Sequence, residues 1–117
     1  MDICFEGVGQ VAATFRVEDG DGVQAGMAVS LTGDGTVGLG IDGDEVCGVL
    51  LGSVRGGAAA VQIGGVAKVG CSDDGIPDVG WQELACDGKG GVKTQDGGVK
   101  CLVLAVDKGG QSVVVKL

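Results

Sequence analysis

The side chains available for chemistry in this chain are mainly cysteines and carboxylates, because the sequence has no histidine and no tyrosine. The five cysteines are Cys4, Cys47, Cys71, Cys86 and Cys101. They form no C-x-x-C pair, and no histidine is present to complete a zinc site or to activate a serine or cysteine nucleophile. We therefore expect no metal site, and thiols that are reduced, buried and inert.

Two acidic segments could coordinate calcium through carboxylates: Glu18-Asp19-Gly20-Asp21 and Asp42-Gly43-Asp44-Glu45. Neither has the spacing of an EF-hand loop, since the twelfth position counted from Asp19 is Ser30 rather than glutamate. We interpret both as solvated turns, with weak ion binding as the alternative. A carboxylate pair for glycoside hydrolysis is compatible with the sequence, but one Trp and no Tyr offer little to line a sugar site. We expect no catalytic residue and no enzymatic activity.

Glycine patterns in the chain imitate nucleotide-binding loops. Residues 88–94, GKGGVKT, are one residue short of the phosphate loop of certain ATPases. They precede another turn, at 95–98, rather than the helix whose N-terminus holds phosphate. Two dinucleotide-type GxGxxG matches, starting at Gly33 and Gly38, lack the strand–loop–helix context, and Asp34 and Asp42 would repel a pyrophosphate. These segments predict turns, and we expect no cofactor.

Trp81 is the single tryptophan in a chain with only two other aromatic residues, Phe5 and Phe15. The sequence allows two interpretations of it. It is either a plug in the core or at a barrel end, or an anchor at a subunit or partner interface, where tryptophan is enriched. Trp81 is therefore the candidate interface residue.

The positions of the glycines indicate where turns end the strands that must position these side chains. Of 26 glycines, seven follow an aspartate, at 19–20, 21–22, 34–35, 42–43, 74–75, 87–88 and 96–97. Asp-Gly between apolar runs is a strong hairpin signal, because type I′ turns need positive φ at both central residues. The central stretch, 46–70, predicts strands at 46–54, 59–63 and 66–69, joined by Gly-Gly turns.

The remaining pattern predicts strands at 3–5, 10–18, 26–31, 36–39, 80–86, 92–94, 99–106 and 111–117. Residues 19–22 and 108–110 are expected turns, and 71–78 is the longest expected loop. In the segment 10–18 the apolar residues alternate, so we expect a half-buried strand. The predicted fold is a single all-β domain over residues 1–117. It is a small barrel or β-sandwich of about 8–10 short, mostly antiparallel strands with little or no helix.

A faint internal repeat runs through this pattern. Val46-x-x-Val49-x-Leu51 followed by Arg55-Gly-Gly resembles Val99-x-x-Leu102-x-Leu104 followed by Lys108-Gly-Gly, at an offset of 53. Upstream, Gly26-Met27 with its Asp-Gly turn resembles Gly80-Trp81 with its own, at an offset of 53 to 54. The pattern favours two similar halves, and a chance match in a Gly/Val/Asp-rich background is the alternative.

The charge distribution bears on partners. The formal net charge is −8, and residues 1–54 hold nine acids and one base, Arg16. Such a chain repels nucleic acid and anionic lipid, so we expect neither as a partner. The excess of acid serves solubility or presents an acidic face to a basic partner. No basic segment precedes an apolar run near the N-terminus, and no run reaches the ~20 apolar residues of a membrane helix. We expect an intracellular product.

The order of short apolar strands and glycine turns over most of residues 8–117 resembles the capsid decoration, or cement, proteins of tailed phages and prophages. This family was formerly catalogued as a bacterial domain of unknown function. The segments that carry the resemblance are Val23-x-x-Gly26-x-x-Val29-x-Leu31 with the Asp34-Gly35 turn, Val46-x-Gly48-Val49-Leu50, Ala60-Val61-Gln62-Ile63-Gly64-Gly65-Val66-Ala67, Asp87-Gly88-x-Gly90-x-Val92 and the closing 113–117.

The resemblance implies an all-β subunit that assembles, often as a trimer, on the outer surface of a phage head and reinforces it. Its partner would be the major capsid protein. It would be found in the bacterial cytoplasm when expressed from a prophage, and then on the capsid surface of the virion. No catalytic residue comes with the resemblance. The alternative function is a small-ligand or carbohydrate-binding β module without catalytic activity, with Trp81 as a stacking platform.

Overall fold

The computed structural model describes residues 9–18, 23–72, 75–107, 109 and 111–117 of the chain. Its regular structure in these ranges is ten β-strands without an α-helix, which confirms the all-β prediction. Accordingly, none of the described segments forms a helix long and apolar enough to cross a membrane. The predicted strand at 3–5, the turn at 19–22 and Cys4 lie outside the described residues, as do parts of the 71–78 loop and the 108–110 turn.

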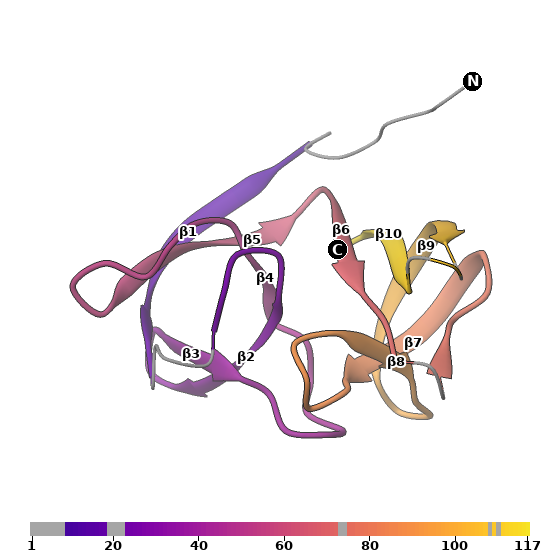
Figure 1. The fold of residues 1–117 in the computed structure, drawn as a ribbon, viewed down its shortest axis with the longest axis horizontal. Coiled ribbons are helices and arrows are strands. Elements are labelled where there is room, and N and C mark those ends of the chain that lie inside the picture. Colours follow the sequence, from indigo (N-terminus) through magenta and orange to yellow (C-terminus); the bar gives the residue numbers. More distant parts are fainter. Residues whose placement is uncertain (1–8, 19–22, 73–74, 108, 110) are drawn as a thin grey trace.

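The first unit of the fold is a closed five-stranded barrel, at the left in Figure 1. Its strands are β1 (Val11–Val17), β2 (Ala28–Gly33), β3 (Thr36–Leu39), β4 (Gly48–Leu50) and β5 (Ala58–Gly64), in the order β1-β3-β2-β4-β5. All pairings are antiparallel except β1–β3. Closure leaves fewer free strand edges than an open sheet would, which is why so short a set of strands is stable.

The second unit is a five-stranded sheet, at the right in Figure 1. Its strands are β6 (Val66–Gly70), β7 (Gly80–Cys86), β8 (Val92–Thr94), β9 (Val99–Asp107) and β10 (Ser112–Lys116), in the order β6-β10-β9-β7-β8. A single parallel bridge, Cys71↔Val92, connects the end of β6 to β8. The sheet therefore curls almost into a barrel, joined at one point along that seam.

The two units repeat one connectivity, which confirms the predicted internal repeat. Each strand pair of the first unit has a counterpart in the second. The pair β1·β5 corresponds to β6·β10, and the pair β1·β3 corresponds to the Cys71↔Val92 bridge between β6 and β8. Likewise, β2·β3 corresponds to β7·β8, β2·β4 to β7·β9, and β4·β5 to β9·β10. Backbone contacts recur with it. Val17 N–H donates to Gly57 O at 2.8 Å, and at the equivalent place in the second unit Cys71 N–H donates to Gln111 O at 2.9 Å.

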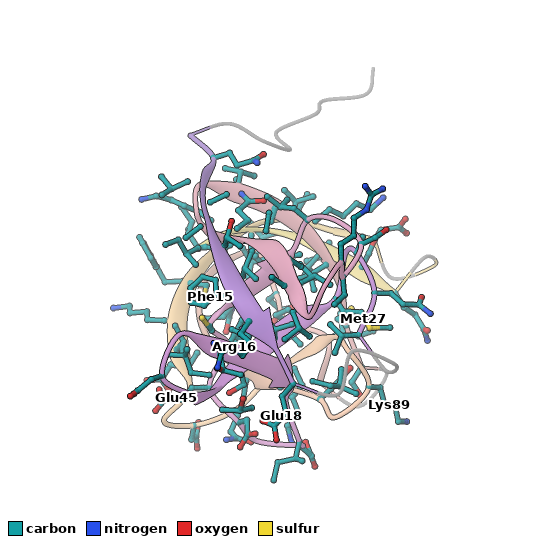
Figure 2. All side chains as sticks on the ribbon, turned by 90° about the vertical axis from the view of Figure 1, so that its left-hand side faces the viewer. Phe15, Arg16, Glu18, Met27, Glu45 and Lys89 are labelled. Atoms are coloured by element: carbon teal, nitrogen blue, oxygen red, sulfur yellow. The ribbon has the colours of Figure 1, made fainter. Side chains whose placement is uncertain are left out.

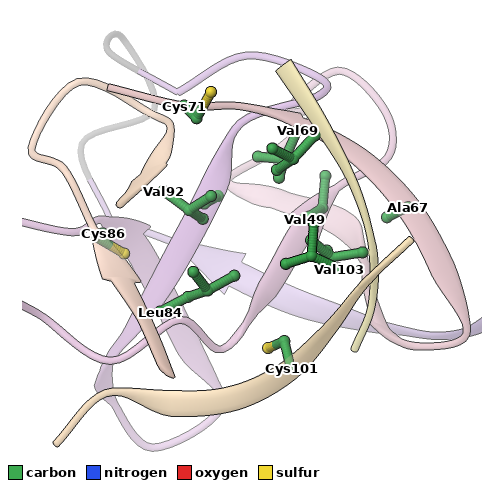
Figure 3. Close-up of a cluster of buried hydrophobic side chains, with 12 residues drawn as sticks. Val49, Ala67, Val69, Cys71, Leu84, Cys86, Val92, Cys101 and Val103 are labelled. Carbon is green, nitrogen blue, oxygen red and sulfur yellow. The ribbon is translucent and has the colours of Figure 1, made fainter. Parts of the chain in front are cut away.

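The core has two parts. One fills the first barrel and is built mainly from valine, with Val29, Val37 and Val61 fully buried. The other fills the second unit and is shown in Figure 3. It also includes Ala28 and Val49, which belong to the outer face of the first barrel. The two units therefore meet across a continuous apolar contact.

The predicted nine-residue strand at 46–54 is wrong in length, because β4 covers only Gly48–Leu50. Pairing ends at Leu51, whose N–H donates to Ala60 O at 2.9 Å. The chain then bends at Gly52 toward the turn bridged by Arg55 and Ala58. The strand therefore ends before the bend at Gly52 and does not reach the Gly56-Gly57 turn.

The prediction that the first long strand is half-buried holds only for its end. Val17 is buried, but Val11 and Ala13 are exposed. The reason is that β1 pairs with β5 along its length, whereas it pairs with β3 only at Arg16 and Val17. The start of β1 therefore projects beyond the barrel, as the indigo strand in Figure 1 shows.

Candidate functional site

Trp81 lies near the start of β7, on the outer face of the second unit. Its side chain is 58% exposed, so it fills neither the core nor a barrel end. Its direct neighbour across the sheet is Leu102 on β9. Gly80, with φ of +116°, precedes it and starts the strand at a backbone conformation that suits glycine.

A row of side chains crosses four strands at the level of Trp81. Because directly opposed residues in an antiparallel pair point to the same face, the register places Trp81, Leu102, Lys116 and Val66 in line on β7, β9, β10 and β6. We call these four residues the Trp81 row. It combines one large exposed ring with aliphatic neighbours, the composition of an interface anchor.

Lysines surround the ring. The Nζ atoms of Lys100 and Lys116 lie 5.7 Å and 6.0 Å from the centroid of the Trp81 ring, within the range of a cation–π interaction. Glu83 is opposite Lys100 in the register, and its Oε2 accepts a hydrogen bond from Gly97 N–H at 3.2 Å. In a chain of net charge −8, this face is locally cationic.

The second acidic segment folds as a turn. The N–H of Ile41 donates to Asp44 Oδ2 at 3.1 Å, and Asp42 forms an ion pair with Lys93 of β8. Among the described residues, no three Cys, Asp or Glu side chains gather as a metal-binding group would require. The first acidic segment continues through Asp19 to Asp21, outside the described residues.

In the glycine-rich segment 88–94, residues 88–91 belong to the predicted hairpin turn between β7 and β8, and residues 92–94 are β8. Asp87 Oδ1 accepts hydrogen bonds from the N–H groups of Lys89 at 2.7 Å and Gly91 at 3.0 Å. These are amides of the kind that a phosphate loop directs at its ligand. Here a carboxylate already occupies them, which opposes an anionic ligand.

The described cysteines lie inside the fold. Cys71, Cys86 and Cys101 are buried and Cys47 is half-buried. Burial raises the pKa of the Cys47 and Cys101 thiols. Burial, followed by the nearby carboxylates of Asp44 and Asp87 and the thiol of Cys47, raises the pKa of Cys86 to about 11. Because thiolate is the nucleophilic form, these three thiols are poor nucleophiles at neutral pH.

Sequence reasoning missed a cleft on the first unit. It has a volume of about 490 Å³ and is lined by Ser30, Leu31, Glu45, Val46 and Cys47. We call it the Leu31 cleft, because Leu31 is a large apolar side chain that is 58% exposed there. The sequence gives one signal for it, an apolar residue at a strand end next to the polar turn 32–35.

The lysines beside Trp81 were also missed, because they are distant in sequence and only the register of β7, β9 and β10 brings them together. The arrangement offers a binding surface: an aromatic ring, aliphatic neighbours and two cations, without an activated nucleophile among the described thiols.

No protein-family model matches the chain, and no curated protein matches its sequence.

Proposed function

We propose that this protein is a structural protein of a phage or prophage, a capsid decoration protein that binds the outer surface of the head as an oligomer and stabilises it. Its partner would be the major capsid protein, and a trimer is the assembly that the family resemblance favours. The protein would be made in the bacterial cytoplasm and end on the capsid surface of the virion. The observation that carries the proposal is the exposed ring of Trp81 on the outer face of an all-β fold.

The physical basis is surface burial. Tryptophan is among the residues that contribute most to binding when an interface buries them. Lysines at the rim steer and orient an acidic partner surface. A subunit that buries such a surface across the junctions between capsomers adds contacts that must break before the shell expands or ruptures.

The test is binding of the purified full chain to empty heads assembled from the major capsid protein of the same phage or prophage. We expect co-sedimentation that saturates at a fixed ratio to the capsid protein, and heads that rupture at a higher temperature when decorated. Trp81→Ala should weaken binding by about tenfold or more, the usual effect of removing an interface tryptophan.

Ile63→Ala is the matched control, because Ile63 is also a large exposed apolar residue on a strand but lies outside the Trp81 row. It should bind heads like the unmodified chain. Heads that sediment without the protein at every concentration would contradict the proposed function, as would full binding by a folded Trp81→Ala variant.

A second candidate, a carbohydrate-binding module, is favoured by the exposed ring of Trp81, since sugars stack on aromatic faces. The ammonium groups of Lys100 and Lys116 lie near the same ring, and a neutral sugar would have to compete with them. Titration with purified oligosaccharides separates the two proposals. Saturable sugar binding that is lost in Trp81→Ala, without binding to heads, would favour the module.

A further inference from the structure

The internal repeat identifies which surface of the first unit corresponds to the Trp81 row. The register pairs Ala28 with Val49 on β2 and β4, Val49 with Gln62 on β5, and Gln62 with Ala12 on β1. The Trp81 row is the same sequence of pairs in the second half of the chain. Trp81 therefore takes the position of Ala28, one residue from the match with Met27 that the sequence pattern predicts.

The two equivalent rows differ in exposure. Ala28, Val49 and Gln62 are only 1%, 3% and 3% exposed, because the second unit covers them. Ala28 and Val49 share a core with Val69 and Val103 of the second unit. Trp81, by contrast, is exposed and Leu102 is only partly covered. Three residues of the first row are buried at the junction, whereas Trp81 at the equivalent position of the second row is exposed; at the far end of the rows Ala12 is exposed and Val66 is buried.

The opposite side of the junction is repeated in the same way. In the second unit, Cys86 is covered by the first unit: its N–H donates to Asp44 O at 2.8 Å, and its O accepts from Gly43 N–H at 2.9 Å. An added Cβ at Gly40 would lie only 2.6 Å from its Sγ. The pairs Leu31↔Val37 and Cys86↔Val92 make Leu31 the counterpart of Cys86 at an offset of 55, because β7 has two more residues than β2 between this position and that of Trp81. Leu31 is exposed, in the Leu31 cleft.

Charge favours contact between these two exposed counterparts. Lys100 and Lys116 flank Trp81, whereas Glu45 lines the Leu31 cleft. Figure 2 shows Glu45 and Glu18 on the side of the molecule that the first unit forms, with Arg16 on the same side. A cationic aromatic surface and an acidic apolar cleft on the same molecule are complementary to each other.

We propose that the Trp81 row of one copy of this chain docks into the Leu31 cleft of a second copy, head to tail. Within each molecule Ala28 and Val49 of the first unit pack against the second unit, whereas the contact between copies sets the Trp81 row of the second unit against the first unit of the next copy. Such a contact is heterologous, so it generates a ring if the rotation closes and a filament if it does not. The inference rests on the proposed function only in treating Trp81 as an interface residue. In the assembled protein a second copy, and not the capsid protein, covers Trp81, so Trp81→Ala weakens head binding through loss of the oligomer.

The test uses two variants that each retain one side of the contact. Trp81→Glu keeps the cleft and Leu31→Glu keeps the ring, and both change exposed side chains. We expect the unmodified chain to assemble in analytical ultracentrifugation without heads present, and each variant alone to be a monomer. An equimolar mixture of the two should form one-to-one dimers, because it retains a single complete contact.

Lys116→Glu provides a second variant that leaves the apolar surface intact. It should weaken assembly by about tenfold, and Glu45→Lys in the other copy should restore it. Ile63→Ala should assemble normally. A chain that is monomeric at all concentrations, an assembling Trp81→Glu variant, or a mixture that stays monomeric would overturn the inference. The head-binding assay distinguishes failure of this inference from failure of the proposed function. A monomeric protein that binds heads would overturn only this inference. An oligomer that does not bind heads would overturn only the proposed function.

Discussion

At the scale of single residues, the fold raises the pKa of the Cys86 thiol more than that of Cys47 or Cys101. Its side chain is 2% exposed and lies near two carboxylates, those of Asp44 and Asp87. Both the desolvation of a thiolate and its repulsion by carboxylates favour the neutral thiol. The residue acts as a small apolar side chain at the junction of the units, against Gly40.

The raised pKa of Cys86 predicts a loss of stability at alkaline pH. That pKa rises from an ordinary value of 9.0 to about 11 on folding. The folded state therefore holds the proton more tightly, so its stabilising effect is complete below pH 9 and is lost as pH rises through 11. We expect the free energy of unfolding, measured with urea, to fall by about 2 kcal/mol across this range.

Cys86→Ala is the control. Because this variant also loses packing, the two proteins are compared by how steeply the free energy of unfolding changes with pH, and not by its absolute value. Its free energy of unfolding should depend less on pH between 9 and 11 than that of the unmodified chain. Equal slopes in the two proteins would mean that Cys86 ionises alike in the folded and unfolded states.

At the scale of elements, turns are the features that the two units share most closely. Gly43 and Gly97 occupy equivalent places in the repeat, Gly26 and Gly80 lie within one residue of equivalent places, and all four have positive φ. Gly57 and Gln111 form a third such pair, with φ of +77° and +50°. Positive φ is costly for residues with a Cβ, so glycine at all of these positions except Gln111 helps to fix where the chain reverses.

The connection between β4 and β5 allows the energetic cost of positive φ to be measured without a steric clash. At Gly57 an added Cβ would meet nothing within 4 Å, so Gly57→Ala tests the cost of positive φ alone. We expect it to lower the free energy of unfolding by about 1 kcal/mol. Gly52→Ala, in the same connection and with equally open space but without positive φ, should be neutral or gain up to about 0.5 kcal/mol. Chemical denaturation of both variants measures the two changes in the free energy of unfolding. Equal changes would contradict the expected cost of positive φ at Gly57.

At the scale of the whole molecule, an apolar contact holds the two units together. Val49 of the first unit packs with Val69, Leu84 and Val103 of the second, as Figure 3 shows. The ion pair between Asp42 and Lys93 also crosses the junction, but the Asp42 side chain is largely exposed. An exposed pair is screened by solvent and contributes little, whereas buried methyl groups contribute fully.

We accordingly expect Val49→Ala to lower the free energy of unfolding by about 2 kcal/mol. Asp42→Ala should change it by less than about 1 kcal/mol. Because Val49 belongs to a core shared by both units, the Val49→Ala protein should still unfold in one transition, followed by Trp81 fluorescence and by circular dichroism. Two separate transitions, or a larger effect of Asp42→Ala, would contradict this account of the junction.

Local chemistry explains why much of the fold could be predicted. The hairpins at 80–94 and 99–117 follow from apolar runs interrupted by Asp-Gly and Gly-Gly, because φ preferences act within a few residues. The internal repeat could be predicted for the same reason, since it consists of the same apolar runs and glycine turns. The length of β4 and the exposure of β1 were predicted wrongly, since both depend on how far a distant partner strand extends.

The sequence alone determined the strand class and most turn positions, both of which follow from residue type and near neighbours. Only the tertiary structure decided that Trp81 is exposed and that Lys100 and Lys116 stand beside it. It also decided that Leu31 opens into a cleft with Glu45. The reason is that sheet register and the docking of one unit on the other join residues far apart in the chain, and no local pattern encodes which of two equivalent rows becomes buried.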